Sequence, residues 1–130
     1  MRSAYVFSRS NGAWVEHQKL TGSGSFVADG FGFSVSLSST TALIGTTSDN
    51  VAGPSSGSVY AFERTGSSWS ETTKLSPFDA APHDNFGRSV SIYGDTAVIG
   101  AFTKSDPHFA SGAAYVFARS DSGWAEVAKL

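Results

Sequence analysis

Residues 84–92, Asp-Asn-Phe-Gly-Arg-Ser-Val-Ser-Ile, repeat residues 29–37, Asp-Gly-Phe-Gly-Phe-Ser-Val-Ser-Leu, at an offset of 55 residues. The same offset relates other residues along the whole chain. They include Tyr5, Tyr60 and Tyr115; Trp14, Trp69 and Trp124; Leu20, Leu75 and Leu130; and the pair Gly45 and Gly100. Self-similarity at a fixed period is typical of proteins that are built from stacked structural units.

The repeat divides the chain into two full copies and one part copy. Residues 21–75 and 76–130 are the full copies and are identical at 20 of 55 aligned positions. Residues 1–20 correspond to the last part of the unit only. We therefore expect three consecutive units, of which the first is incomplete.

Each full copy predicts four short strands. In the first copy they fall at 31–37, 41–45, 59–64 and 69–75, and the part copy holds the last two, at 3–9 and 14–20. Asn11-Gly12 is a strong hairpin signal between those two strands. Apolar residues alternate with Ser34 and Ser36 at the period of a strand. Both faces of the 3–9 strand are apolar, which indicates a sheet that is covered on both sides.

These features predict an all-β protein made of four-stranded antiparallel sheets. Four strands in a repeat of about 50 residues are typical of a β-propeller blade. A propeller closes with about four to eight blades. We therefore expect a homo-oligomer or membership of a longer array of blades.

The composition excludes several classes of partner. The net charge of −2 with scattered Lys and Arg argues against nucleic acid, and no apolar run is long enough for membrane insertion. The N-terminal residues enter a strand pattern without the features of a signal peptide. There is no cysteine, and 14 glycines with only 15% charged residues favour tight turns and an extracellular or cell-surface protein.

Three motifs in register resemble the FG-GAP repeat, the blade unit of the integrin α-subunit propeller and of many bacterial surface proteins. The motifs are Phe31-Gly32 and Phe86-Gly87; Ile44-Gly45-Thr46 and Ile99-Gly100-Ala101; and the strands that follow Gly57 and Gly112. The Trp-x-Glu-x-x-Lys-Leu strand is typical of bacterial versions. The resemblance implies that the first strand of each repeat lines a central channel and the fourth lies at the rim.

One part of the family pattern is missing. Many such repeats carry an acidic calcium loop between their first two strands, where carboxylate oxygens surround the ion. Here those turns are Ser38-Ser39-Thr40 and Tyr93-Gly94-Asp95, which hold one carboxylate at most. We expect no calcium there, no other metal and no cofactor.

The polar loop residues leave two interpretations open. Asp79, His83 and Asp84 precede the second Phe-Gly, and Asp106 and His108 lie in a later loop. They form either solvated turns or a metal or ligand site. Asp29 and Asp84 occupy equivalent positions, so we expect both to accept backbone hydrogen bonds in the turn.

The tyrosines and phenylalanines that recur at the offset of 55 residues could stack on sugars or bases, but their recurrence on a strand with two apolar faces favours packing. Tyr60, Phe62 and their equivalents are expected to pack between neighbouring sheets. Trp14, Trp69 and Trp124 follow a turn and are candidates for ligand contact. No nucleophile is accompanied by a general base, so catalysis is not expected.

The sequence favours a non-catalytic propeller module for adhesion, ligand binding or self-assembly. Loops 46–56 and 101–111 differ most between the copies, and differences between repeats usually collect on the binding face. The candidate contacts are Asp49, Asn50, Asp106, His108 and the three tryptophans. A carbohydrate-binding lectin and a fragment of a larger propeller enzyme are the alternatives.

Overall fold

The computed structural model describes residues 2–105 and 108–130. Ten strands and no helix are found among them, and hence no helix long and apolar enough to cross a membrane. The strands are β1 (Ala4–Ser10), β2 (Ala13–Leu20), β3 (Phe31–Leu37), β4 (Thr41–Thr46), β5 (Ser58–Thr65), β6 (Ser68–Leu75), β7 (Phe86–Tyr93), β8 (Thr96–Ala101), β9 (Ala113–Ser120) and β10 (Gly123–Lys129). The predicted strands agree with these bounds to within one residue.

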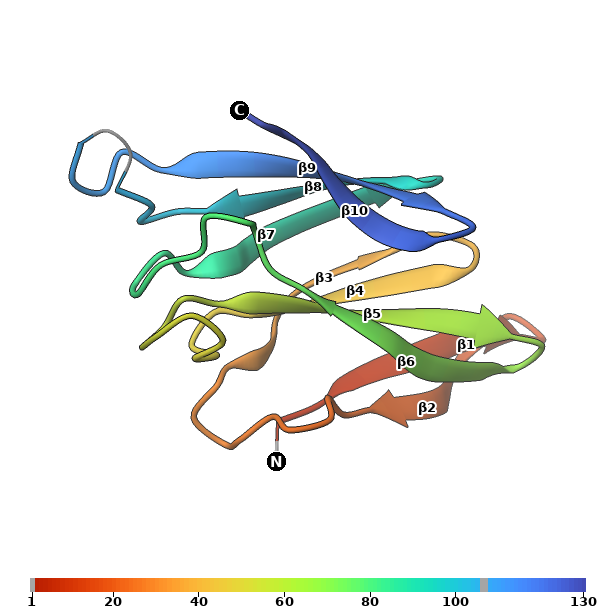
Figure 1. Ribbon diagram of the computed structural model, residues 1–130. Coiled ribbons are helices and arrows are strands. Elements are labelled where there is room, and N and C mark those ends of the chain that lie inside the picture. Colours follow the sequence, from red (N-terminus) through yellow and green to blue (C-terminus); the bar gives the residue numbers. More distant parts are fainter. Residues whose placement is uncertain (1, 106–107) are drawn as a thin grey trace.

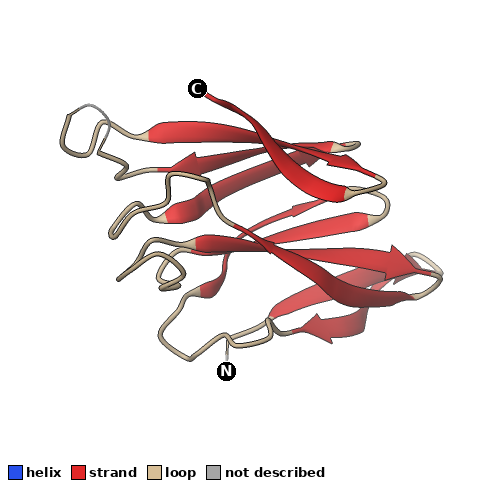
Figure 2. Ribbon diagram, in the orientation of Figure 1, coloured by secondary structure: helices blue, strands red, loops and turns tan. Residues whose placement is uncertain are grey.

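The strands form three antiparallel sheets, joined only by loops and turns (Figure 2). We call β1-β2 the N-terminal hairpin, β3-β4-β5-β6 the middle sheet and β7-β8-β9-β10 the C-terminal sheet. Each sheet is a meander in which strands adjacent in sequence are paired. The three sheets are stacked face to face in chain order (Figure 1). The prediction of an all-β protein with antiparallel sheets is confirmed.

Strand β4 of the middle sheet is apolar on both of its faces, and both are covered. All six residues of β4 are buried. Leu43 points into a cluster shared with the C-terminal sheet, whereas Ala42 and Ile44 point into a cluster shared with the N-terminal hairpin. Because successive side chains of a strand point to opposite faces, β4 contributes to two separate cores.

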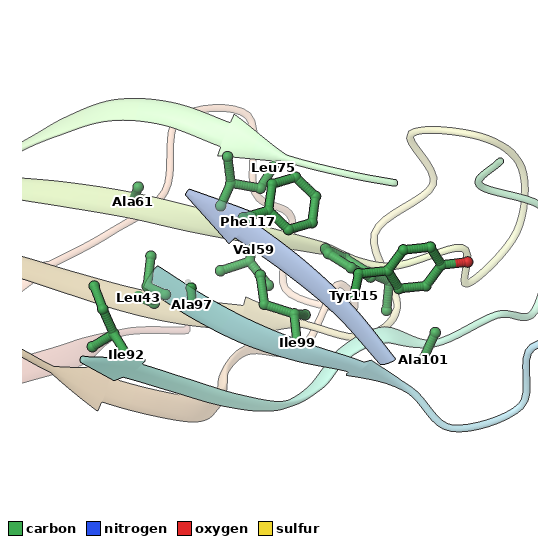
Figure 3. Close-up of a cluster of buried hydrophobic side chains, with 11 residues drawn as sticks. Leu43, Val59, Ala61, Leu75, Ile92, Ala97, Ile99, Ala101, Tyr115 and Phe117 are labelled. Atoms are coloured by element: carbon green, nitrogen blue, oxygen red, sulfur yellow. The ribbon is translucent and has the colours of Figure 1, made fainter. Parts of the chain in front are cut away.

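The larger core fills the space between the middle and C-terminal sheets (Figure 3). It contains Leu43, Val59, Ala61 and Leu75 from the middle sheet, and Phe86, Ile92, Ala97, Ile99, Ala101, Tyr115 and Phe117 from the C-terminal sheet. The smaller core repeats this arrangement one unit earlier. It contains Ala4 and Leu20 from the hairpin, and Phe31, Ala42, Ile44, Tyr60, Phe62 and Trp69 from the middle sheet.

The Phe of each Phe-Gly pair anchors the start of the first strand of its sheet. Phe31 meets the Tyr60 ring edge-on, with 5.3 Å between the ring centroids. Phe86 meets Tyr115 in the same way at 5.7 Å. Edge-to-face pairs of this kind contribute beyond the area that they bury.

The serines between the apolar residues allow neighbouring sheets to approach closely. The Ser34 hydroxyl donates to the Gly87 carbonyl at 2.6 Å, and the Ser36 hydroxyl accepts from the Ile92 N–H at 3.0 Å. A Cβ added to Gly45 would lie 2.1 Å from the Gly87 carbonyl oxygen. The motif glycine is therefore required by the distance between the two backbones.

An arginine ties the C-terminal sheet to the middle sheet at the turn end. The Arg119 guanidinium forms ion pairs with Glu63 of the middle sheet and with Asp95 of its own sheet. It also donates to the Thr41 hydroxyl at 2.6 Å. The hydrogen bonds to Asp95 and Glu63 raise the pKa of Arg119 above its ordinary value.

Equivalent residues are exposed to different extents because the stack has two ends. Leu20 and Leu75 are 2% and 5% exposed, whereas Leu130 is 73% exposed. Tyr60 is fully buried, but Tyr5 is 51% exposed on the outer face of the hairpin. The predicted packing of the aromatic residues between sheets is confirmed in the two full repeats. It is wrong for Tyr5 and Phe7 of the part copy, which are about half exposed because no described sheet covers that face of the hairpin.

Candidate functional site: the loop end of the sheets

The long connections gather at one end of the stack, and the short turns lie at the other (Figure 1). The long connections are 21–30 and 76–85, which enter β3 and β7, and 47–57 and 102–112, which enter β5 and β9. This end therefore brings together both of the loops that the sequence identifies as most variable.

Two of these connections are hydrogen-bonded to each other across the sheets. The carbonyls of Pro54, Ser55 and Ser56 accept from the N–H groups of His83, Asn85 and Phe86, at 2.7, 3.1 and 3.0 Å. The variable loop of the middle sheet thus holds the segment that leads into β7. The backbone, more than the side chains, fixes the relative position of the two loops.

Asp29 and Asp84 close the same turn in the two repeats. Asp29 Oδ2 accepts from the Phe26 N–H at 2.6 Å, and Asp84 Oδ2 accepts from the Ala81 N–H at 2.8 Å. Both side chains are buried. They therefore form part of the turn that delivers each Phe-Gly pair into its strand.

A buried lysine joins Asp84 to Asp79. Lys104 is only 5% exposed, and its Nζ lies 2.9 Å from Asp84 Oδ2 and 3.6 Å from Asp79 Oδ2. It also donates to the Asp79 carbonyl. The ammonium group supplies the positive charge that two adjacent carboxylates require.

The cluster continues from Asp79 to the C-terminal sheet. Tyr115 donates its hydroxyl proton to Asp79 Oδ1 at 2.6 Å, and Lys129 Nζ donates to Oδ2 at 2.6 Å. Burial and this hydrogen bond raise the pKa of Tyr115 well above its ordinary value. Burial acts to raise the pKa of Asp79, but the hydrogen bonds from Lys129 and Tyr115 outweigh it and leave the pKa lowered.

The lowered pKa predicts that Asp79 contributes to acid sensitivity. Its charged form stabilises the fold fully above the ordinary pKa of 3.8, and this contribution is lost as the pH falls through the lower pKa of the folded state. Asp79→Asn should therefore be less stable than wild type at neutral pH, with a shallower loss of stability below about pH 4. Urea unfolding between about pH 7 and about pH 2 measures this slope.

Asp121→Asn is the control for that experiment, because Asp121 is an exposed aspartate in the turn at the opposite end of the C-terminal sheet. Its stability curve should run parallel to that of wild type. A curve for Asp79→Asn that also runs parallel would contradict the assigned role of Asp79.

In the middle sheet a different ion pair occupies the equivalent place. Asp49 is 8% exposed, lies 2.9 Å from Lys74 Nζ, and accepts from the Ser58 hydroxyl at 2.6 Å. Its carboxylate is thus turned inward and holds the loop in place. Asn50 is exposed, and its side-chain oxygen accepts from the Ser55 N–H at 2.9 Å.

The other candidate residues do not converge on one site. Trp14 is 69% exposed and Trp69 is 7% exposed, while Trp124 is half-buried against the larger core. His108 is exposed on its loop, and Asp106 lies outside the described residues. Among the described residues, no three His, Asp or Glu side chains are grouped so that they could hold a metal ion.

Several residues that shape this end were not identified from the sequence. Lys104 stands where the first copy has Asp49, a reversal of charge that the repeat alignment could have revealed. Phe102 and Phe109 are 62% and 94% exposed on the second variable loop. An apolar residue exposed in a loop has no periodic pattern, so only the structure identifies these two.

The comparisons with known proteins agree with the repeat. A family model described as FG-GAP repeat matches residues 14–62 and 69–117. The two matches start at Trp14 and Trp69, 55 residues apart, and each contains the last strand of one sheet and the first three of the next. The family unit is therefore shifted by one strand relative to the sheets. No curated protein matches the chain.

Proposed function

Because the chain belongs to the FG-GAP repeat family, we propose that it is a non-catalytic β-propeller module that binds a partner through its loop end. Repeats of this family are generally ligand-binding or adhesion modules and typically occur in extracellular or surface proteins. Four-stranded meanders stacked face to face are consistent with propeller blades. Surface or secreted localisation of this chain is part of the proposal.

The exposed phenylalanines of the second variable loop carry the proposal. Phe102 and Phe109 present large apolar side chains to water at the end where both variable loops lie. Aromatic residues often dominate the energetics of interaction sites, and these two are the exposed aromatic residues of the second variable loop. The well-bonded framework beneath them, with Lys104 buried at its centre, favours a rigid platform.

Binding can be tested on arrays of glycans and of purified extracellular-matrix proteins. Wild-type chain should bind at least one probe, and Phe102→Ser/Phe109→Ser should lose that binding. Tyr93→Ser is the matched control, because Tyr93 is 90% exposed and is the last residue of β7, at the opposite end of the sheets. Binding only to glycans would favour the lectin alternative over protein adhesion.

Absence of binding by the wild-type chain to every probe would contradict the proposal. So would binding that Tyr93→Ser loses as fully as the double variant, because the surface involved would then not be the loop end. Circular dichroism of each variant shows whether its fold is retained.

The two ends of the stack support a further part of the proposal, that several chains or further blades complete the particle. The hairpin exposes Tyr5, Phe7 and Trp14, and the C-terminal sheet exposes Val98 and Leu130. The residues equivalent to these five are buried or half-buried between sheets in the rest of the stack. Apolar sheet faces of this kind favour association in water.

Light scattering at several concentrations measures the native mass. We expect a discrete mass of two or more chains, or open-ended assembly if the stack extends by adding chains. A monomer that is stable and soluble at high concentration would show that the end faces are tolerated in water, and would contradict self-assembly.

A further inference from the structure

The N-terminal hairpin has a strand edge that its equivalents use for pairing. In the middle sheet β5 pairs with β4 on one side and β6 on the other, and β9 likewise lies between β8 and β10. Within the described residues β1 pairs with β2 alone. The second edge of β1 therefore presents backbone donors and acceptors without a neighbouring strand.

An apolar groove lies beside this edge. It has a volume of about 480 Å³, and its walls come from β1 and from the facing side of β3 and β4. Tyr5, Phe7, Val35, Leu37, Ala42 and Ile44 are among its lining residues. The groove therefore joins an unpaired strand edge to an uncovered sheet face.

The repeat shows what covers the same surface one unit later. Val35 and Leu37 are 61% and 60% exposed, whereas the equivalent Ile92 is 9% exposed and Val90 is half-buried. Ile92 and Val90 pack in the larger core with Leu43 of β4. The first two strands of the preceding sheet thus provide the cover that Val35 and Leu37 lack.

The covering strands also make polar contacts that identify their sequence pattern. Ser36 of β3 accepts a hydrogen bond from the Ile92 N–H, and Ser34 donates to the Gly87 carbonyl. The corresponding groups of the middle sheet are the Leu37 N–H and the Gly32 carbonyl. A strand that covers them needs small hydroxyl side chains at alternate positions, followed by an apolar second strand.

We propose that the edge of β1 and the groove beside it form an acceptor site for a β-hairpin donated by another polypeptide that carries this repeat. The hairpin would have the pattern of β7-β8, which pairs Ile99 with Tyr115 and Ala97 with Phe117. In the same register Ile99 and Ala97 of the donor lie opposite Tyr5 and Phe7. The added hairpin completes a four-stranded sheet by strand addition. This inference rests on the proposed blade architecture and concerns a different surface from the loop end.

A peptide of residues 84–103, labelled with fluorescein, is the probe. Its fluorescence anisotropy should rise saturably with wild-type chain, and a scrambled peptide of the same composition should give no such rise. Leu37→Asp places a carboxylate in the floor of the groove and should weaken binding about tenfold or more. Because Leu37 is exposed, the variant should fold, as circular dichroism would show.

Val98→Asp is the matched control, because Val98 lies on the uncovered face of the C-terminal sheet and is 42% exposed. It should bind the peptide as wild type does. Loss of binding with Val98→Asp and not with Leu37→Asp would place the peptide on the opposite face and overturn the inference. No binding of the peptide to wild type would also overturn it.

The result of the peptide-binding experiment can be distinguished from that of the array experiment, which tests the proposed function. Binding to the array depends on Phe102 and Phe109 at the loop end, whereas peptide binding depends on Leu37. Retained array binding together with failure of the peptide would remove the acceptor site alone.

Discussion

Replacing Gly45 by alanine is expected to destabilise the protein by about 3 kcal/mol, whereas Gly100→Ala should cost less than about 1 kcal/mol. The new Cβ at position 45 would lie 2.1 Å from the Gly87 carbonyl oxygen, so the backbone of one sheet must move. At position 100 the Cβ would meet only the Ser89 hydroxyl within 3 Å, at 2.4 Å, and that side chain can rotate. Urea unfolding followed by circular dichroism measures both changes.

The comparison isolates the effect of a neighbouring sheet, because the two glycines occupy equivalent positions in the repeat. Neither needs a left-handed backbone, so conformational strain does not contribute to the difference. Equal destabilisation by the two substitutions would show that the glycine serves its own strand and not the contact between sheets. If chains assemble through the C-terminal sheet, Gly100→Ala should in addition lower the native mass.

Replacing Lys104 by alanine is expected to cost about 3–5 kcal/mol, because it leaves a buried carboxylate without its partner. Asp84 has a side chain only 4% exposed, and Lys104 Nζ lies 2.9 Å from its Oδ2. The double variant Lys104→Met/Asp84→Asn should recover much of the loss, since neither charge then remains buried. The free energy of unfolding of the single and double variants tests this.

Lys74→Ala is the matched control for the lysine experiment. Lys74 pairs with Asp49 at the same distance of 2.9 Å, but its side chain is 30% exposed. Solvent can replace part of that interaction, so a smaller loss of about 1–2 kcal/mol is expected. If Lys104→Met/Asp84→Asn is as unstable as Lys104→Ala, the loss of stability does not come from an unpaired buried charge, and the explanation is wrong.

The strands and their order followed from the sequence because two regular signals coincide. The period of two in 31–37 and the offset of 55 residues each identify the strands independently. Asn11-Gly12 marks a turn whose central residues both have positive φ, at 51° and 80°, as its residue types predict. Local signals of this kind need no knowledge of distant contacts.

The solvent exposure of individual side chains could not be predicted in the same way. Trp14 and Trp69 occupy the same position of the repeat, yet they are 69% and 7% exposed. The difference arises because the N-terminal hairpin lies against Trp69, whereas no described sheet covers Trp14, and the local sequence does not encode this. Similarly, Asp49 was a candidate contact because it lies in a variable loop, but Lys74 and Ser58 hold its carboxylate inside.

The meander topology has a consequence for folding during synthesis. Every sheet consists of one uninterrupted stretch of chain, and its strands pair with their neighbours in sequence. Low sequence separation between pairing partners favours rapid folding, because little loop entropy is lost before contacts form. The middle sheet can therefore form as soon as Leu75 has left the ribosome. Until β7 to β10 have been made, the face that later packs against the C-terminal sheet is exposed to water, and the nascent chain could aggregate through it.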